Sequence, residues 1–216
     1  MPNELIRQQN VKRVLQNAMQ LFMNNGVEST SVEMIARRAN LSLRTVQNYY
    51  HTKNDLIAAV LDYEYAIELE EMETCVSTEE FQNMPGAKQI LTIVASVYHK
   101  AVKHAEEIFC ETQMQYLVSH ASKFEGKPLL TGNWKYITEH IQTAFNKGLQ
   151  DGSITRQMEL SLLDAKSITL ALYGIKEQIS FAMCDRELKK LFQPEIAAQK
   201  YVQQIELLLS VKQEYY

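Results

Sequence analysis

Apolar residues near the start of the chain recur at spacings of three and four, which indicates one face of an amphipathic helix. This face comprises Val11, Val14, Leu15, Ala18, Leu21 and Phe22. The run Asn24-Asn25-Gly26 predicts the end of this helix. A second, shorter apolar face follows at Val32, Ile35, Ala36 and Ala39. The S/T-x-x-E spacing of Thr30 and Glu33 predicts a capping box at its start.

A sharp turn and a third helix come next. Asn40 belongs to the residue types that tolerate the left-handed backbone conformation in which many helices end. Ser42 is placed to cap the following helix, which we expect over residues 43–50. A fourth helix is expected over residues 52–75. The pattern therefore predicts two short helices joined by a tight turn and followed by a long helix.

Turn-forming residues divide the rest of the chain into further long helices. We expect loops at residues 77–86 and 124–133, and helices at 87–121 (with a possible interruption), 134–150, 157–183 and 195–212. Apolar residues make up 46% of the 216 residues, and there are only 7 Gly and 4 Pro. This composition favours uninterrupted helices over a turn-rich β architecture, so the sequence predicts an all-α fold.

The charge is distributed unevenly along the chain. The net charge is -4, but residues 1–56 hold seven Lys and Arg against four acids, a balance of +3, and the remainder is therefore at -7. A polyanionic partner is expected at the basic end.

Residues 30–56 read TSVEMIARRANLSLRTVQNYYHTKNDL, a compact helix-turn-helix of the kind that lays its second helix in the major groove of DNA. This segment resembles the N-terminal motif of the TetR family of bacterial transcription regulators. The matching positions are Thr30, Ile35, Ala36, Ala39, Ser42, Thr45, Tyr49, Lys53 and Leu56, with conservative changes at Ser31, Leu41, Val46 and Tyr50. Two positions depart from the family pattern: Asn40 replaces the usual turn glycine and Gln47 replaces the usual tyrosine.

The resemblance implies an N-terminal DNA-binding domain at residues 1–56 and a larger helical domain for ligand binding and dimerisation at 57–216. By this resemblance, Ser31, Thr45, Tyr49 and Lys53 would hold phosphates, and Leu43, Arg44, Gln47 and Asn48 would face base edges. Thr30, Ser42 and His51 complete the expected DNA-binding surface. Chemistry agrees in outline, because arginine can read guanine and an amide side chain can read adenine.

The C-terminal helices are expected to form a homodimer, as the last two long helices do in the family. The segment ITLALYGI at residues 168–175 is apolar almost all round, which suits a helix between its own core and a partner. The residues expected at this interface are Leu170, Tyr173, Gly174, Tyr201, Ile205 and Leu208. A purely internal core is the alternative interpretation of the same pattern.

Aromatic and methionine residues in the middle helices are candidates for lining the cavity of an unidentified small-molecule effector. These are Tyr98, Phe109, Met114, Tyr116, Trp134, Phe145, Tyr173 and Met183. Most of them would also suit an ordinary core.

The motifs of other protein classes are missing from the sequence. His99 and His104 lie five residues apart and so do not share a helical face, and no Gly-rich phosphate loop or nucleophile elbow is present. We therefore expect no enzyme activity, no cofactor and no metal. The three cysteines are widely spaced, which suits reduced thiols, and no apolar segment suggests a signal peptide or a membrane span. A cytoplasmic location is expected.

The sequence as a whole predicts a dimeric regulator that binds double-stranded DNA at a palindromic operator. A repressor released by its effector is the favoured form, although the sequence leaves repressor and activator open. The alternative is a helical dimeric protein that binds a partner or ligand and has lost specific DNA reading, because Gln47 departs from the family pattern.

Overall fold

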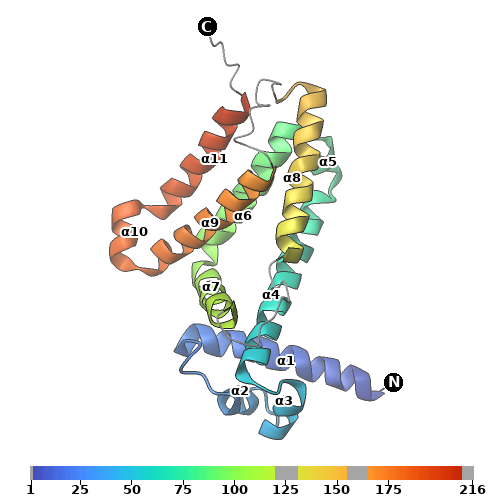
Figure 1. Ribbon diagram of the computed structural model, residues 1–216, viewed down its shortest axis with the longest axis vertical. Helices are drawn as coiled ribbons and strands as arrows, with labels where there is room; N and C mark the ends of the chain where they lie inside the picture. The colour runs from blue at the N-terminus through green and yellow to red at the C-terminus, as the bar shows by residue number, and fades with distance from the viewer. Residues whose placement is uncertain (1, 120–130, 155–164, 211–216) are drawn as a thin grey trace. The chain divides into compact units, whose positions relative to one another are not determined.

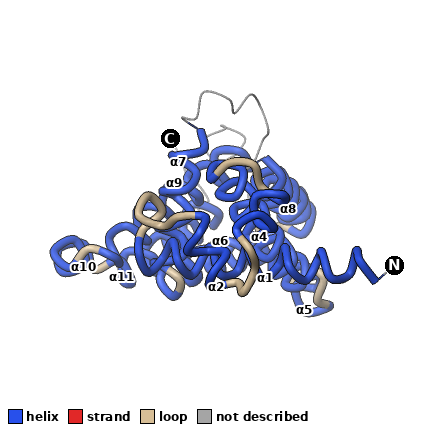
Figure 2. Tube along the Cα trace, turned by 90° about the horizontal axis from the view of Figure 1, so that it is seen from below, coloured by secondary structure: helices blue, strands red, loops and turns tan. Residues whose placement is uncertain are grey.

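The structure, a computed structural model, describes residues 2–119, 131–154 and 165–210, apart from the side chains of residues 2, 3, 131–133, 208 and 210. These ranges contain eleven helices and no strand, which confirms the predicted all-α fold. Figures 1 and 2 show that the described parts of the chain are helical, with loops between the helices. In the same ranges, no helix combines the length and apolarity that crossing a membrane requires.

The chain forms two compact units. Unit 1 comprises residues 1–67 and 110–129, and unit 2 comprises residues 68–109 and 130–216. The expected division at residue 56 separates roles rather than packing, and it stays a prediction. Residues 57–67, which follow that expected boundary, pack with the N-terminal helices and belong to the same compact unit.

Unit 1 contains α1 (Pro2–Asn25), α2 (Val32–Arg38) and α3 (Leu43–Tyr49). It also holds the first part of α4 (Lys53–Val76) and the second part of α7 (Ala105–Ser119). The apolar face predicted for α1 is buried from Val14 onward. It lies in the core of this unit together with residues of α2, α3 and α4.

The start of α2 differs from the prediction. Ser31, not Thr30, is the N-cap, and its hydroxyl accepts a hydrogen bond from the Met34 backbone N–H at 3.2 Å. Thr30 is completely buried, and its hydroxyl lies within hydrogen-bonding distance of the Gly26 carbonyl (2.9 Å) and the Leu21 carbonyl (3.2 Å). The predicted capping box was therefore wrong, because Thr30 satisfies backbone groups at the end of α1 instead.

Unit 2 is arranged around α6 (Gly86–Lys103), which packs against three other helices. These are α8 (Thr131–Asp151), α9 (Ala165–Cys184) and α11 (Pro194–Ser210). The short helices α5 (Glu79–Asn83) and α10 (Arg186–Phe192) complete the unit. Its core consists mainly of Ile, Val and Leu side chains from α6, α8 and α9.

The helix bounds follow the predictions with local differences. The expected loop at 77–86 contains α5, which Thr78 caps. The segment 87–121 is interrupted at His104, so α6 and α7 are separate helices. Parts of the predicted loop at 124–133 and of the predicted helix at 157–183 fall on residues 124–130 and 157–164, which lie outside the described residues. Residues 131–133 belong to α8.

A close approach of backbones joins the start of α6 to the end of α8. A Cβ atom on Gly86 would lie 2.1 Å from the Gly148 nitrogen and 2.2 Å from the Ala144 oxygen. Asp151 accepts hydrogen bonds from the backbone N–H groups of Gly86 and Ser153, both at 2.9 Å. The first turn of α6 is therefore capped by a side chain from the end of α8.

Candidate nucleic-acid interface

One face of α3 is free of contacts with the core. Val46 is completely buried, whereas Arg44, Gln47 and Asn48 are exposed and Leu43 is half-buried. Positions 43, 44, 47 and 48 share a helical face because they are separated by one residue and by one turn. The structure therefore brings together the four side chains that were predicted to face base edges.

The turn before α3 holds this helix in place. Asn40 has φ 54°, the left-handed conformation predicted for it. Ser42 caps α3, since its hydroxyl accepts from the Thr45 backbone N–H at 3.0 Å, and the two hydroxyls are 2.8 Å apart. Both hydroxyls have exposed surface, so they satisfy the helix end and remain near the molecular surface.

Thr30 does not share this surface. Its side chain is completely buried, so it belongs to the core of unit 1 and cannot offer its hydroxyl to DNA. The prediction for Thr30 was wrong because family position alone does not say which neighbouring hydroxyl faces solvent. Ser31, the N-cap of α2, is exposed, so it stays a candidate for contacting a phosphate.

Tyr49, Tyr50 and His51 lie at the end of α3. The Tyr49 and Tyr50 rings meet edge to face, with centroids 6.4 Å apart. Burial, with a smaller contribution from Tyr49, raises the pKa of Tyr50, so its phenol remains a neutral hydrogen-bond donor at ordinary pH. Tyr49 is half-buried and His51 is exposed.

Lys53, at the start of α4, contacts the turn between α1 and α2. Its ammonium group donates to the Glu28 carbonyl at 3.0 Å. Burial lowers the pKa of Lys53, and the charge of Glu28 opposes that shift. Thr52 and Asp55 cap α4 reciprocally, because each side chain accepts from the other's backbone N–H (2.8 and 3.1 Å). A phosphate at this helix end would compete with the Glu28 carbonyl for Lys53.

A second surface feature lies in unit 2, where α9, α10 and α11 border an open groove of about 790 Å³. Its walls are mostly apolar, and exposed large apolar side chains lie on these helices: Leu170, Phe181, Leu191, Phe192, Ile196, Tyr201 and Leu207. We call this groove with its exposed side chains the apolar face. The extent of the apolar face through α10 was not anticipated, because the pattern of RELKKLF is too short to show which side is buried.

The residues predicted for the dimer interface divide between this surface and the core. Leu170, Gly174 and Tyr201 are exposed on it, and Ile205 is half-buried. Tyr173 is 6% exposed and stacks on Trp134, so it belongs to the core and not to the apolar face. The side chain of Leu208 lies outside the described residues.

The eight candidates for an effector cavity are not gathered in one place. Met114 and Tyr116 belong to unit 1, where Met114 is completely buried and Tyr116 is 64% exposed, so Tyr116 cannot line an enclosed cavity. The other six lie in unit 2. Phe109 packs against Phe181 with centroids 5.7 Å apart, and Tyr98 is buried in the core. Phe145 and Met183 are half-buried against the core of unit 2.

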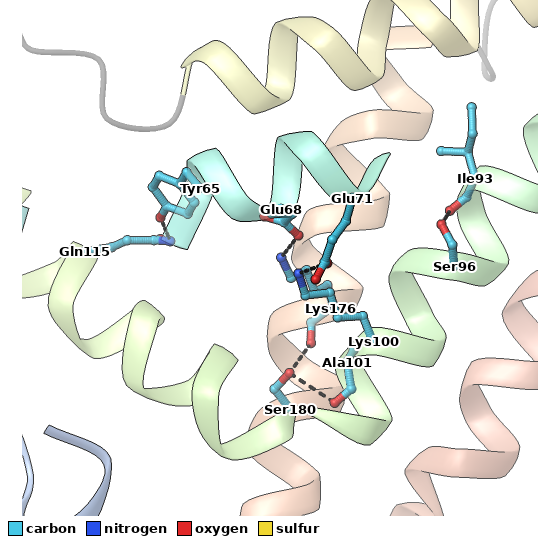
Figure 3. A network of polar contacts seen from close by, with 10 residues as sticks. All are labelled: Tyr65, Glu68, Glu71, Ile93, Ser96, Lys100, Ala101, Gln115, Lys176 and Ser180. Atoms are coloured by element: carbon cyan, nitrogen blue, oxygen red, sulfur yellow. Dashed lines mark hydrogen bonds and ion pairs between the residues drawn. The ribbon is translucent and has the colours of Figure 1, made fainter. Parts of the chain in front are cut away.

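Trp134 on α8 and Tyr173 on α9 form a stacked aromatic pair in this unit. Their centroids are 4.5 Å apart and their planes are inclined by 13°. Lys176 lies over the Tyr173 ring, with its nitrogen 5.4 Å from the centroid, and forms a buried ion pair with Glu68 (Figure 3). Sequence reasoning missed the Glu68–Lys176 ion pair; the available signal was a lysine directly after the apolar segment 168–175.

In the described parts of the chain, no group of three or more His, Cys, Asp or Glu side chains could hold a metal ion. Burial raises the pKa of the Cys110 thiol to about 12, which keeps it protonated and poorly nucleophilic.

Comparisons with known proteins agree with this geometry. A model of the family described as bacterial regulatory proteins, tetR family, matches residues 14–60, the segment that contains α2 and α3. A search of curated protein sequences gives no match.

Solved structures are similar over nearly the whole chain. A TetR transcription regulator from Haloarcula marismortui is 18% identical, with a TM-score of 0.70 over 91% of this chain and 98% of that one. A tetR-family regulatory protein from Rhodococcus is 16% identical, with a TM-score of 0.66 over 93% and 97%. The regulator FadR from Bacillus subtilis, solved with stearoyl-CoA, is 18% identical, with a TM-score of 0.62 over 92% and 97%.

At these identities the likeness establishes the fold, and the family model identifies the N-terminal segment. Residues 14–60 therefore match the family described as bacterial regulatory proteins, tetR family, and the chain has the fold of the solved TetR transcription regulators.

Proposed function

We propose that this protein is a sequence-specific, homodimeric transcription regulator that binds a palindromic operator through α3. The observation that carries the proposal is the row of exposed side chains Arg44, Gln47 and Asn48 on a short helix fixed by caps at its start. Arginine suits the acceptor edge of guanine, and amides suit the N6 and N7 edge of adenine. Ser31, Ser42, Thr45, Tyr49, His51 and Lys53 would contact the backbone around this row.

The apolar face supports a dimer. A single α3 reads too few base pairs for useful affinity, whereas two copies bind half-sites one helical turn apart, about 34–36 Å. The exposed side chains Leu170, Phe181 and Tyr201 would be covered by the apolar face of a second copy, because a two-fold interface uses the same surface of both copies. An uncovered apolar surface of this kind marks an interaction site.

The larger unit would hold a small-molecule effector whose binding releases the operator, which makes the protein a repressor in the cytoplasm. FadR, which shares the fold, was solved in complex with stearoyl-CoA, and this supports the proposal that a protein of this fold binds a small molecule. Coupling of this kind typically amounts to about 1–3 kcal/mol and must be reciprocal, so the effector should bind less tightly to the operator complex.

The test is selection of duplexes from a random DNA library by the full-length protein, followed by anisotropy titrations of the enriched sequence. We expect an inverted repeat, and an affinity that falls steeply with salt and survives excess competitor DNA. The matched control is the same duplex with one half-site scrambled. Failure to enrich any sequence would refute DNA reading and favour a helical protein that binds a partner only.

A further inference from the structure

Trp134 carries a buried hydrogen-bond donor that the protein does not use. Its indole nitrogen is inaccessible to solvent and has no hydrogen-bond partner among the described residues. Tryptophan can only donate, so only an acceptor can satisfy this group. Buried polar groups without a partner are rare in folded proteins, because each one loses its hydration without compensation.

The surroundings of this donor are flat and aromatic. The Trp134 ring lies almost parallel to Tyr173, at 4.5 Å between centroids, and Trp134 itself is only half-buried. On α8, one turn after Trp134, the Thr138 hydroxyl is 2.7 Å from the Trp134 carbonyl and 3.1 Å from the Thr169 hydroxyl, so these polar groups are engaged with each other. The two threonine hydroxyls therefore do not satisfy the indole N–H, which stays a buried donor at this stack.

The charge next to the stack is already balanced. Lys176 lies 5.4 Å from the centroid of Tyr173, and its ammonium nitrogen is 2.6 Å from the Glu68 carboxylate. Both side chains are at most 11% exposed. A charged ligand would bring an uncompensated charge to this buried site, which is costly, whereas an uncharged ligand would not.

We propose that the effector is an uncharged, planar molecule that packs against Trp134 and accepts the indole N–H with a carbonyl oxygen. This inference rests on the effector-responsive function proposed above, and it names the chemical class of the effector. Stacking on the ring would supply apolar contact, and the carbonyl would fix the orientation of the ligand.

The chain offers a direct reporter, because Trp134 is its one tryptophan and gives a single indole N–H resonance. The experiment titrates the ¹⁵N-labelled full-length protein, without DNA, with four probes of similar shape. Acetophenone carries the carbonyl acceptor, and α-methylstyrene replaces that oxygen by carbon. Benzoate and benzylamine add a negative and a positive charge.

We expect acetophenone to move the indole resonance downfield in a saturable manner, in the millimolar range typical of such small fragments. The isostere α-methylstyrene should not move it downfield, and both charged probes should bind more weakly than acetophenone. Equal binding of α-methylstyrene, tighter binding of either charged probe, or no saturable shift with any probe would overturn the proposal.

Calorimetric titrations of two variants with acetophenone distinguish the contribution of the indole N–H from that of the shape of the site. Trp134→Phe keeps a ring but removes the N–H, and it should weaken acetophenone about five- to tenfold, as expected for one buried hydrogen bond. Tyr63→Phe is the control, because it also removes one polar group from an aromatic side chain, but in unit 1, and it should leave the affinity unchanged. Equal affinities for Trp134→Phe and the wild type would contradict the proposal. Since these titrations contain no DNA, their failure would leave the test of operator binding unaffected.

Discussion

The Lys176 ammonium nitrogen on α9 lies 2.6 Å from the Glu68 carboxylate on α4, in an ion pair that joins positions 108 residues apart. Next to it, the Ser180 hydroxyl is 2.9 Å from the Lys176 carbonyl and 3.5 Å from the Ala101 carbonyl (Figure 3). Three helices of unit 2 thus meet around one buried polar cluster. Removing one partner of such a pair leaves the other as an unpaired buried charge.

Replacing Lys176 by methionine should therefore destabilise the protein by about 3–5 kcal/mol, measured by urea unfolding at a fixed protein concentration. The double variant Glu68→Leu/Lys176→Met removes both charges and should recover most of that loss. Lys100→Met is the control, because the Lys100–Glu71 pair has side chains 27% and 62% exposed and should contribute less than about 1 kcal/mol. Similar losses in the free energy of unfolding from Lys176→Met and Lys100→Met would show that the burial of an ion pair does not determine its contribution to stability.

Gly86→Ala tests the backbone approach between α6 and α8. The new methyl group would meet the Gly148 nitrogen and the Ala144 oxygen at 2.1 and 2.2 Å, and neither backbone atom can move away cheaply. We expect a loss of at least about 2 kcal/mol in the free energy of unfolding. An unchanged unfolding midpoint would mean that the two helices separate at this point without cost.

Asp151 should make the stability depend on pH in the acidic range. Hydrogen bonds from the Ser153 hydroxyl and then from the Gly86 and Ser153 backbone N–H groups lower its pKa below the ordinary 3.8. A depressed carboxyl pKa stabilises the folded state above the unfolded pKa, and this stabilisation is lost as the pH falls through the lower folded value.

The measurement for Asp151 is the unfolding midpoint between about pH 2 and pH 6, compared for the wild type and Asp151→Asn. The difference between the two proteins should be greatest above the ordinary carboxyl pKa and should shrink in acid. A constant difference across the range would assign the effect of the variant to packing instead.

Gln47 and Lys53 should affect DNA binding in different ways. Gln47→Ala should relax the preference for one base pair of each half-site, by about 1–3 kcal/mol for a good contact. Lys53→Ala should weaken all sequences similarly and reduce the salt slope by about one unit, provided that the ammonium group leaves the Glu28 carbonyl for a phosphate. Anisotropy titrations of the selected duplex and single-base variants at several salt concentrations distinguish the two effects.

The control for this pair is Lys88→Ala, which removes an exposed lysine of unit 2. It should leave both the base preference and the salt slope unchanged. The same loss of base preference from Gln47→Ala and Lys53→Ala would contradict the proposed division between base and phosphate contacts.

Local backbone chemistry explains which features could be predicted from the sequence. The left-handed turn at Asn40 and the cap by Ser42 depend on residues within a few positions of each other, so their pattern was sufficient. The cap of α2 was assigned to the wrong hydroxyl because a distant contact, between Thr30 and the Leu21 carbonyl, decides which side chain is buried. The spacing of Thr30 and Glu33 contains no information about that contact.

Features that join distant parts of the chain escaped prediction for the same reason. The segment 168–175 of α9 is apolar almost all round and has no polar face to indicate which side meets solvent. Tyr173 was therefore assigned to an interface, although it stacks on Trp134. The Glu68–Lys176 pair depends on how α4 and α9 pack, which no local pattern encodes. Aromatic composition likewise could not show that Tyr116 and Trp134 belong to different units.

The apolar face belongs to unit 2 and α3 to unit 1, and this separation has a genetic consequence. If the apolar face pairs two copies, a chain with a defective α3 still pairs normally. A cell that makes both versions of the chain would then assemble mixed dimers in which only one copy has a functional α3. Such mixed dimers would bind the operator poorly. Loss-of-contact alleles in α3 would therefore be dominant over the wild-type gene, whereas alleles that abolish pairing would be recessive.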